Sequence, residues 1–168
     1  MDKLEIINQA YRKYLDLTDK IRSVYYESEK YPIFKCDVDE ILYYTEEYIR
    51  EIFLNIAFAS GTMSPEEAEF IKKFDIVRRP RSLDEQETEN NELHSTAMRI
   101  PRYLKLACEV DKYAGTKYGE MFVNTVKDVC TLLHSVDGEE SAEETEFTTV
   151  LITNLEDYLK ESEKKDEE

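Results

Sequence analysis

The residues best suited to chemistry include a cysteine and a histidine in the last third of the chain. Cys130 and His134 stand four residues apart, a spacing that puts two side chains on one face of a helix. A thiolate and an imidazole could supply two ligands of a zinc site, with Cys108 or Asp137 as the candidates to complete it. No Cys-x-x-Cys or His-Glu-x-x-His motif accompanies them. A buried cysteine beside a turn histidine is therefore the preferred interpretation, and zinc is the alternative.

Carboxylates form a second candidate site, after the segment that carries this pair. Asp137-Gly138, with Glu144 seven positions after the aspartate, imitates the middle and end of an EF-hand calcium loop. The first two ligand positions of such a loop would fall on Leu133 and Ser135, so the segment is not an EF-hand. A looser divalent-cation site stays open as an alternative. Its candidate ligands are Asp137, Glu140, Glu143 and Glu144.

Other common catalytic patterns are absent from the sequence. The four glycines never cluster into a phosphate-binding loop, and no serine or cysteine nucleophile motif occurs. With 38 acidic residues, no chosen pair of carboxylates is informative about acid–base catalysis. We therefore expect no enzymatic activity. A metal-dependent hydrolase is a more distant hypothesis, because it requires carboxylates that converge on one pocket.

The acidic turn occurs twice, at residues 60–70 and again at 137–147, with a constant offset of 77 residues. In each copy a glycine follows an apolar segment, where a helix end favours a left-handed residue. Ser64 with Glu67, and Ser141 with Glu144, then form the Ser-x-x-Glu pattern of a capping box. Helix capping and the helix dipole explain the motif without a metal. The repeated unit therefore predicts a helix, a tight turn and a second helix.

Scarce helix breakers, four Gly and four Pro, and 41% hydrophobic residues favour an all-helical single domain. Apolar periodicity predicts helices at about 4–25, 38–59, 65–76, 99–114, 117–135 and 142–160. Pro101 fits the first turn of the fourth helix, and Gly115 is expected to close it. The predicted inner faces carry Leu4, Ile7, Tyr11, Tyr14, Thr18, Ile21 and Tyr25; Ile41, Tyr44, Tyr48, Ile52, Ile56 and Ala59; Phe70, Ile71 and Phe74; Leu104, Cys108 and Asp111 or Lys112; Phe122, Val126, Val129, Leu133 and Val136; and Phe147, Leu151, Leu155, Tyr158 and Leu159.

These helices predict an all-α, pseudo-symmetric bundle of two three-helix halves, because one half alone could not bury its apolar faces. The first half covers residues 1–77 and the second 96–160. Between them lies a polar loop at 78–95, and a disordered acidic tail is expected at 161–168.

At the repeated turn, the chain resembles the tellurite-resistance TerB-like family, whose halves each turn through Asp-Gly-x-x-Ser-x-x-Glu. The second copy matches from Asp137 to Glu144, whereas the first matches at Gly61, Ser64 and Glu67 but departs at Ser60. The resemblance covers roughly residues 38–160. It implies a non-catalytic scaffold or sensor of stress and defence systems, and for the family also divalent-cation binding through acidic residues.

The net charge of −16 argues against nucleic acids and anionic membranes, and favours basic proteins or divalent cations as partners. No stretch approaches the ~20 apolar residues of a membrane span, and the N-terminus lacks the apolar core of a secretion signal. Three scattered cysteines are too few for a disulfide framework, so a cytoplasmic location is expected.

We expect a protein partner or a cis-attached domain, with a homodimer as one option, and we expect the chain to be the N-terminal part of a larger protein. A divalent-cation-binding sensor is the alternative function.

Two groups of residues are candidates for contact with that partner. Eight of the twelve tyrosines precede residue 49, and core packing explains most of them because they follow the helical stripes. Tyrosine is also enriched at binding hot spots, and an arginine cluster can hold a phosphate or acidic group. The candidates are Tyr25, Tyr26, Tyr31, Arg78, Arg79 and Arg81, with core packing and a solvated loop as the competing interpretations.

Overall fold

The computed structural model describes residues 12–13, 15–23, 43–44, 48–49, 51–52, 54–56, 58–59, 63–65, 68, 98–134 and 141–164. The regular elements within these ranges are all helices, as expected for an all-α protein. Three helices are described in full: α5 (Arg102–Ala114), α6 (Tyr118–His134) and α7 (Ala142–Lys164). The predicted helices at 99–114, 117–135 and 142–160 are confirmed, with shifts of a few residues at their ends.

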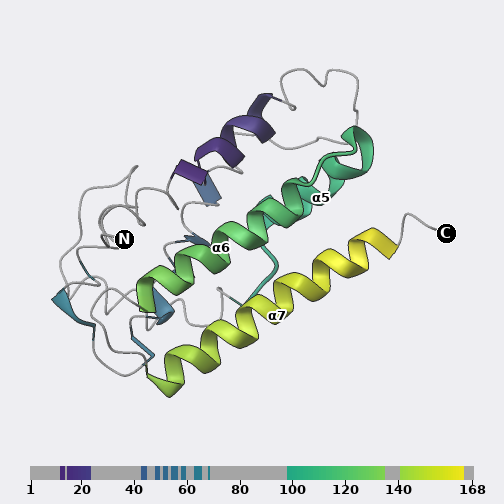
Figure 1. Ribbon diagram of the computed structural model, residues 1–168. Coiled ribbons are helices and arrows are strands. Elements are labelled where there is room, and N and C mark those ends of the chain that lie inside the picture. The colour runs from purple at the N-terminus through teal and green to yellow at the C-terminus, as the bar shows by residue number, and fades with distance from the viewer. Residues whose placement is uncertain are drawn as a thin grey trace.

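The three helices form an up-down-up arrangement in which the chain reverses after α5 and again after α6 (Figure 1). α6 packs against both α5 and α7 and therefore lies at the centre of this part of the fold. The helical residues 15–23 belong to the same body, because the neighbouring Lys13 ammonium lies 2.5 Å from the Asp128 carboxylate of α6. A second ion pair, between Lys127 and Glu156, joins α6 to α7.

The ends of α5 follow from its sequence. Gly115 adopts a left-handed conformation with φ of 63°, and its amide donates to the Asp111 carbonyl at 2.8 Å. This residue closes the helix as predicted, because glycine has no Cβ to oppose a positive φ. Pro101 lies one position outside the predicted first turn. It is the N-cap, with the extended φ and ψ of −68° and 148°, and the helix begins at Arg102.

The core is formed largely by the predicted stripes. Leu104 and Cys108 of α5 are buried, whereas Asp111 is half-buried and Lys112 is exposed. On α7, Leu151 and Leu155 are buried. The other predicted residues of α6 and α7 divide into a buried group, Phe122, Val126, Val129 and Leu133, and a half-buried group, Phe147, Tyr158 and Leu159.

Phe122 links the two parts of the chain. Its side chain has no exposed surface, and its ring lies between those of Tyr103 on α5 and Tyr48 from the first part of the sequence. The ring centroids are 5.2 Å apart for Tyr103 and 6.4 Å apart for Tyr48. Burial raises the pKa of the Tyr48 hydroxyl, which therefore stays protonated. One hydrophobic core thus contains residues from both parts of the chain.

In the first part, Thr18, Ile21, Tyr48, Ile52 and Ile56 are buried as predicted, and Ala59 is half-buried. Leu17 is also fully buried, although it lies beside the predicted stripe. The remaining predicted positions lie outside the described residues: Leu4, Ile7, Tyr11, Tyr14, Tyr25, Ile41, Phe70, Ile71, Phe74 and Val136.

The prediction for Tyr44 is wrong. Its side chain is 47% exposed, and its ring contacts the edge of Tyr43 and the guanidinium of Arg102 instead of the core. The predicted stripe advances by four residues from Tyr44 to Ile56, and each such step rotates about 40° beyond a full helical turn. Three steps therefore carry Tyr44 away from the face that holds Ile56.

α7 also extends beyond its predicted end near residue 160. It continues to Lys164, so the first four residues of the predicted disordered tail are helical. Glutamate and lysine are good helix formers, which is consistent with the extension. The Ser162 hydroxyl donates to the Leu159 carbonyl within this last stretch, at 2.8 Å. The rest of the predicted tail, 165–168, lies outside the described residues.

Candidate functional site

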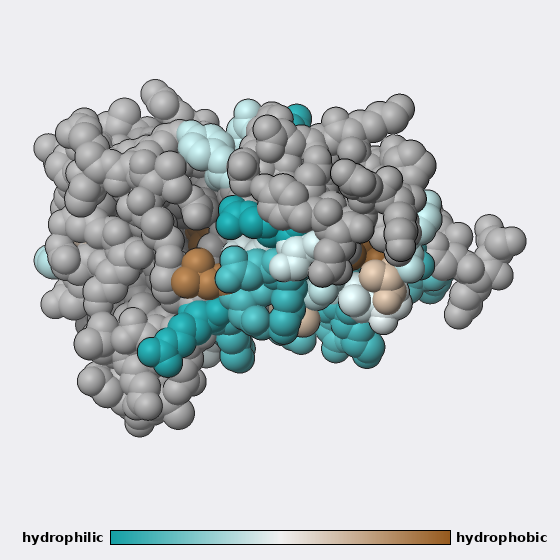
Figure 2. All heavy atoms as spheres, turned by 90° about the horizontal axis from the view of Figure 1, so that it is seen from above, coloured by the Kyte–Doolittle hydropathy of each residue, from teal (hydrophilic) through white to brown (hydrophobic). Residues whose placement is uncertain are grey.

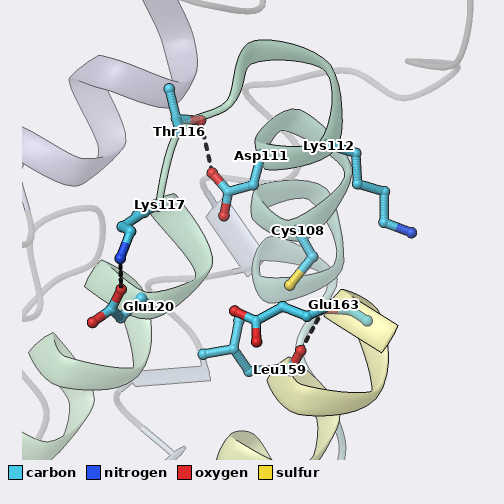
Figure 3. Close-up of a pocket in the computed structure, with 9 residues that line it drawn as sticks. Cys108, Asp111, Lys112, Thr116, Lys117, Glu120, Leu159 and Glu163 are labelled. Atoms are coloured by element: carbon cyan, nitrogen blue, oxygen red, sulfur yellow. Dashed lines mark hydrogen bonds and ion pairs between the residues drawn. The ribbon is translucent and has the colours of Figure 1, made fainter. Parts of the chain in front are cut away.

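A pocket of about 230 Å³ lies where the α5–α6 turn meets the last turns of α7 (Figure 3). It brings side chains of different chemical types together from three helices. The lining consists of Cys108, Asp111 and Lys112 from α5, Thr116, Lys117 and Glu120 from the turn and the start of α6, and Leu159, Ser162 and Glu163 from α7.

The Asp111 carboxylate organises one wall of this pocket. One oxygen accepts hydrogen bonds from the Thr116 hydroxyl and the Tyr118 amide, both at 2.7 Å. The other oxygen accepts a hydrogen bond from the Gly119 amide at 2.8 Å. These two amides belong to the first turn of α6 and have no partner within the helix. Asp111 therefore caps α6 from the end of the preceding helix and holds the two helices in a fixed hairpin.

Gly119 allows the three helices to meet beside this carboxylate. A Cβ atom at this position would lie 2.9 Å from Leu159 Cδ1 and 3.0 Å from the Cys108 sulfur, both closer than a normal contact. The same Cβ would lie 3.3 Å from the Asp111 carboxylate. The close packing of α5, α6 and α7 at the pocket therefore depends on the missing side chain.

Gly119→Val is expected to lower the free energy of unfolding by about 1–3 kcal/mol, the usual range for overpacking a filled core. Leu159 can rotate away from the new side chain, but the short Cys108 side chain cannot. Urea denaturation monitored by circular dichroism measures the change. Gly115→Ala is the companion variant, because a Cβ there meets no atom within 4 Å and the cost comes from the positive φ alone. Wild-type stability for Gly119→Val would contradict the predicted packing.

Several of the other polar groups of the pocket also bond to their neighbours. The Lys117 ammonium lies 3.2 Å from the Glu120 carboxylate, and Figure 3 marks this ion pair among the residues that line the pocket. The Ser162 hydroxyl donates to the Leu159 carbonyl at 2.8 Å. Groups that are bonded within the wall are poor candidates for binding an incoming ligand.

The two described cysteines have protonated thiols. Burial raises the pKa of Cys108, against a smaller opposing effect of the Ser162 hydroxyl. Burial raises the pKa of Cys130 to about 12, and only 1% of this residue is exposed. Because the thiolate is the nucleophile and the metal ligand, neither cysteine is activated at neutral pH.

Among the described residues, the candidate zinc ligands Cys108, Cys130 and His134 do not form a metal-binding group. His134 ends α6 and its Nε2 lies 3.0 Å from the Thr148 hydroxyl of α7, in a contact that fixes the ring between two helices. Asp137 lies outside the described residues. Over the ranges that the structure describes, no three His, Cys, Asp or Glu side chains are grouped as metal ligands.

The capping box predicted at the second turn is present. The Glu144 amide donates to the Ser141 hydroxyl at 3.1 Å, and the Ser141 amide donates to the Glu144 carboxylate at 3.3 Å. Glu144 is only 7% exposed, so its carboxylate faces the helix end. Glu143 is exposed to solvent beside it. The other two candidate cation ligands, Asp137 and Glu140, lie outside the described residues.

The candidate partner-binding residues are not placed by the structure. All six lie outside the described residues, namely Tyr25, Tyr26, Tyr31, Arg78, Arg79 and Arg81. The capping role of Asp111 and the packing role of Gly119 were missed by the sequence analysis. A signal for the first existed, because Asp111 continues the apolar stripe of Leu104 and Cys108 just before a helix-closing glycine. No sequence signal marked Gly119, since its neighbours at the contact come from two other helices.

Comparison of the chain with family models, curated proteins and solved structures found no match. In the described part of the chain, none of the helices combines the length and the apolar character that crossing a bilayer requires.

Proposed function

We propose that this chain is a non-catalytic protein-interaction or regulatory module of TerB-like type, working in the cytoplasm with a protein partner or an attached domain of a larger protein. The observation that best supports the proposal is that Glu144 forms part of a helix-capping box. This carboxylate is the most conspicuous acid of the repeated turn, and it is buried in a capping box. The Ser-x-x-Glu motif on which the family resemblance rests therefore stabilises a helix end, and we place the function on the surface of the protein.

Two observations support the proposed organisation into two similar halves. The Ala68 amide donates to the Ser64 carbonyl at 3.1 Å, and 77 residues later the Thr145 amide donates to the Ser141 carbonyl at 3.2 Å. Burial agrees at five positions over the same offset and differs at two, where Leu54 and Ala68 are buried but Thr131 and Thr145 are exposed. The pairs in which both members are buried are Tyr48 and Thr125, Ile49 and Val126, Ile52 and Val129, Asn55 and Leu132, and Ile56 and Leu133.

The character of the described surface supports an interaction role as well. On the face shown in Figure 2, the coloured residues are mostly hydrophilic, with hydrophobic residues in small patches only. The outer face of α7 is mainly acidic: it bears the exposed residues Glu143, Glu146, Asp157 and Glu161, beside the exposed Lys160 and Lys164. Such a surface suits reversible contact with another macromolecule better than the enclosure of a small substrate.

Quantitative affinity purification of the full chain from its native cells tests the proposal. We expect one protein to be enriched reproducibly over a control purification, and to bind the purified chain directly in a calorimetric titration. A charge-altered variant, Glu146→Lys with Asp157→Lys, distinguishes capture by the acidic face of α7 from capture elsewhere. Absence of any enriched protein, or a hydrolytic turnover abolished by one substitution in the pocket, would count against an interaction module.

Millimolar calcium, magnesium or zinc is expected to leave the melting temperature of the chain unchanged. A cation that binds only the folded state would raise the melting temperature by mass action, but Glu144 is already committed to the capping box. Differential scanning calorimetry with and without each metal, with EDTA as the reference, gives the answer. A reproducible rise that Glu143→Gln abolishes would support the cation-sensor alternative.

A further inference from the structure

The outward face of α7 carries a regular line of exposed residues. They follow one another in steps of three and four, and such steps keep side chains on one side of a helix. α7 forms the outer edge of the described helices and packs on α6 with its opposite face (Figure 1). This line, the α7 stripe, consists of Glu143, Glu146, Val150, Thr153, Asp157, Lys160 and Lys164.

The charges of the α7 stripe change sign along the helix. Its first two residues, Glu143 and Glu146, are acidic, and its last two, Lys160 and Lys164, are basic. The helix dipole favours acids in the first turn and bases in the last turn, but its effect falls off within those turns. Glu146 and Lys160 lie further inside the helix, so the dipole alone does not account for their signs.

The middle of the α7 stripe can be covered at low cost. Val150 has an apolar side chain that is 46% exposed. The Thr153 hydroxyl donates to the Thr149 carbonyl of the same helix at 2.8 Å. A hydroxyl that is bonded in this way does not become an unsatisfied donor when another chain covers it. The uncharged centre of the stripe therefore suits a contact between helices.

We propose that the α7 stripe is a dimer interface, in which it packs against the same stripe of a second copy in antiparallel orientation. Glu146 and Lys160 each lie seven residues from Thr153. A two-fold axis at Thr153 therefore places Glu146 of one chain opposite Lys160 of the other, and Glu143 close to Lys164 in the same way. The sequence left a homodimer open as one option, and the stripe gives that dimer a defined surface.

The ion pairs already present on α7 are compatible with this arrangement. Within the described ranges they join Lys127 to Glu156, and Asp157 to Lys160. In the second pair the side chains are 62% and 64% exposed and the N–O distance is 3.5 Å, so it is a weak surface contact. A lysine ammonium has three donors and can hold a further carboxylate at the same time. Glu146 takes part in neither pair, so its carboxylate can accept the ammonium of a second chain.

The order of the charges selects a second copy as the occupant. A uniformly basic partner would be attracted by Glu143 and Glu146 but repelled by Lys160 and Lys164. A uniformly acidic partner would be repelled at the other end. A reversed copy presents opposite charges at both ends. The net charge of −16 opposes association, but charges more than about 10 Å apart are largely screened at 0.1 M salt, and the short pairs then decide.

Sedimentation equilibrium of the full chain tests the proposal. We expect the average mass to rise above the 19.9 kDa of one chain as the concentration increases from about 1 µM to about 1 mM. Glu146→Lys and Lys160→Glu should each weaken self-association at least about ten-fold, because two attractive pairs of the dimer become repulsive.

The double variant, Glu146→Lys with Lys160→Glu, is the decisive comparison. It has the net charge of the wild type, and the two pairs across the dimer again join opposite charges. We expect it to associate within about three-fold of the wild type, as a coupled pair should. The two positions are about 21 Å apart along α7, at 1.5 Å per residue, so they cannot compensate each other within one chain.

Asp19→Lys is the matched control, because it makes the same change in charge as Glu146→Lys at an exposed acid of a different helical segment. It should not weaken self-association, and circular dichroism confirms that each variant is folded. The proposal is overturned if the wild type keeps the mass of one chain at every concentration, if Asp19→Lys acts like Glu146→Lys, or if the double variant is as weak as the single ones.

This proposal and the proposed function fail separately. If the chain captures another protein but stays monomeric, the interaction function stands and the dimer interface is wrong. If the dimer forms and responds to the variants as expected while no other protein is captured, the dimer interface stands and binding of a different partner fails.

Discussion

Replacing Phe122 with alanine is expected to lower the free energy of unfolding by about 3–5 kcal/mol, the usual effect of truncating a buried aromatic residue. The ring is fully buried between Tyr48 and Tyr103, so its removal leaves a cavity that three segments of the chain would have to fill. α5, α6 and the first part of the chain all lose contacts at once. Chemical denaturation, analysed as a two-state transition, measures the loss.

Two further variants make this prediction decisive. Phe122→Leu keeps most of the apolar volume and is expected to cost no more than about 1.5 kcal/mol, so it remains folded if the alanine variant does not. Val150→Ala removes methyl groups from a side chain that is 46% exposed, and should change stability by less than about 0.5 kcal/mol. If Phe122→Ala lowered the free energy of unfolding no more than Val150→Ala, Phe122 would not be the link between the two parts of the core.

Asp111→Ala is expected to destabilise the fold by about 2–3 kcal/mol, the combined loss of a helix cap and of hydrogen bonds to a charged acceptor. The carboxylate satisfies the Tyr118 and Gly119 amides and the Thr116 hydroxyl. Without it, α6 begins with free amides and the α5–α6 turn loses its fixed geometry. Hydrogen exchange of the Tyr118 and Gly119 amides should accelerate more than exchange in the middle of α6.

A graded series gives this prediction its control. Asp111→Asn keeps one acceptor oxygen and should lose roughly half of the stability lost in Asp111→Ala, since an amide nitrogen cannot accept the second backbone hydrogen bond. Asp157→Asn removes the same charge at an exposed position, where Asp157 forms only a surface pair with Lys160, and should have an effect below about 1 kcal/mol. Equal effects of Asp111→Asn and Asp157→Asn would mean that charge, and not capping, is responsible.

Local features of this protein could be predicted from the sequence because their causes lie within a few residues. Gly115 ends α5 since only glycine adopts a positive φ without strain, and Ser141 caps α7 with Glu144 three residues away. The α6 stripe from Phe122 to Leu133 is likewise set by helical periodicity, and it is buried as predicted. The division into two similar halves, the protein partner and the TerB-like function stay predictions.

The remaining features were decided only by tertiary structure. Tyr44 is exposed because a drift of 40° per step takes it off the inner face, where Arg102 from a distant segment meets it. Asp111 caps a helix that begins seven residues later, and Gly119 is needed because Cys108 and Leu159 converge on it from two other helices. The sequence by itself thus determined which reactive groups are present and how they are spaced, namely Cys130, His134 and the acidic turn. The tertiary structure decided how these groups are used: the Cys130 thiol is buried, His134 contacts Thr148, and Glu144 caps a helix. The reason is that the environment of a side chain is made largely by residues from other segments of the chain.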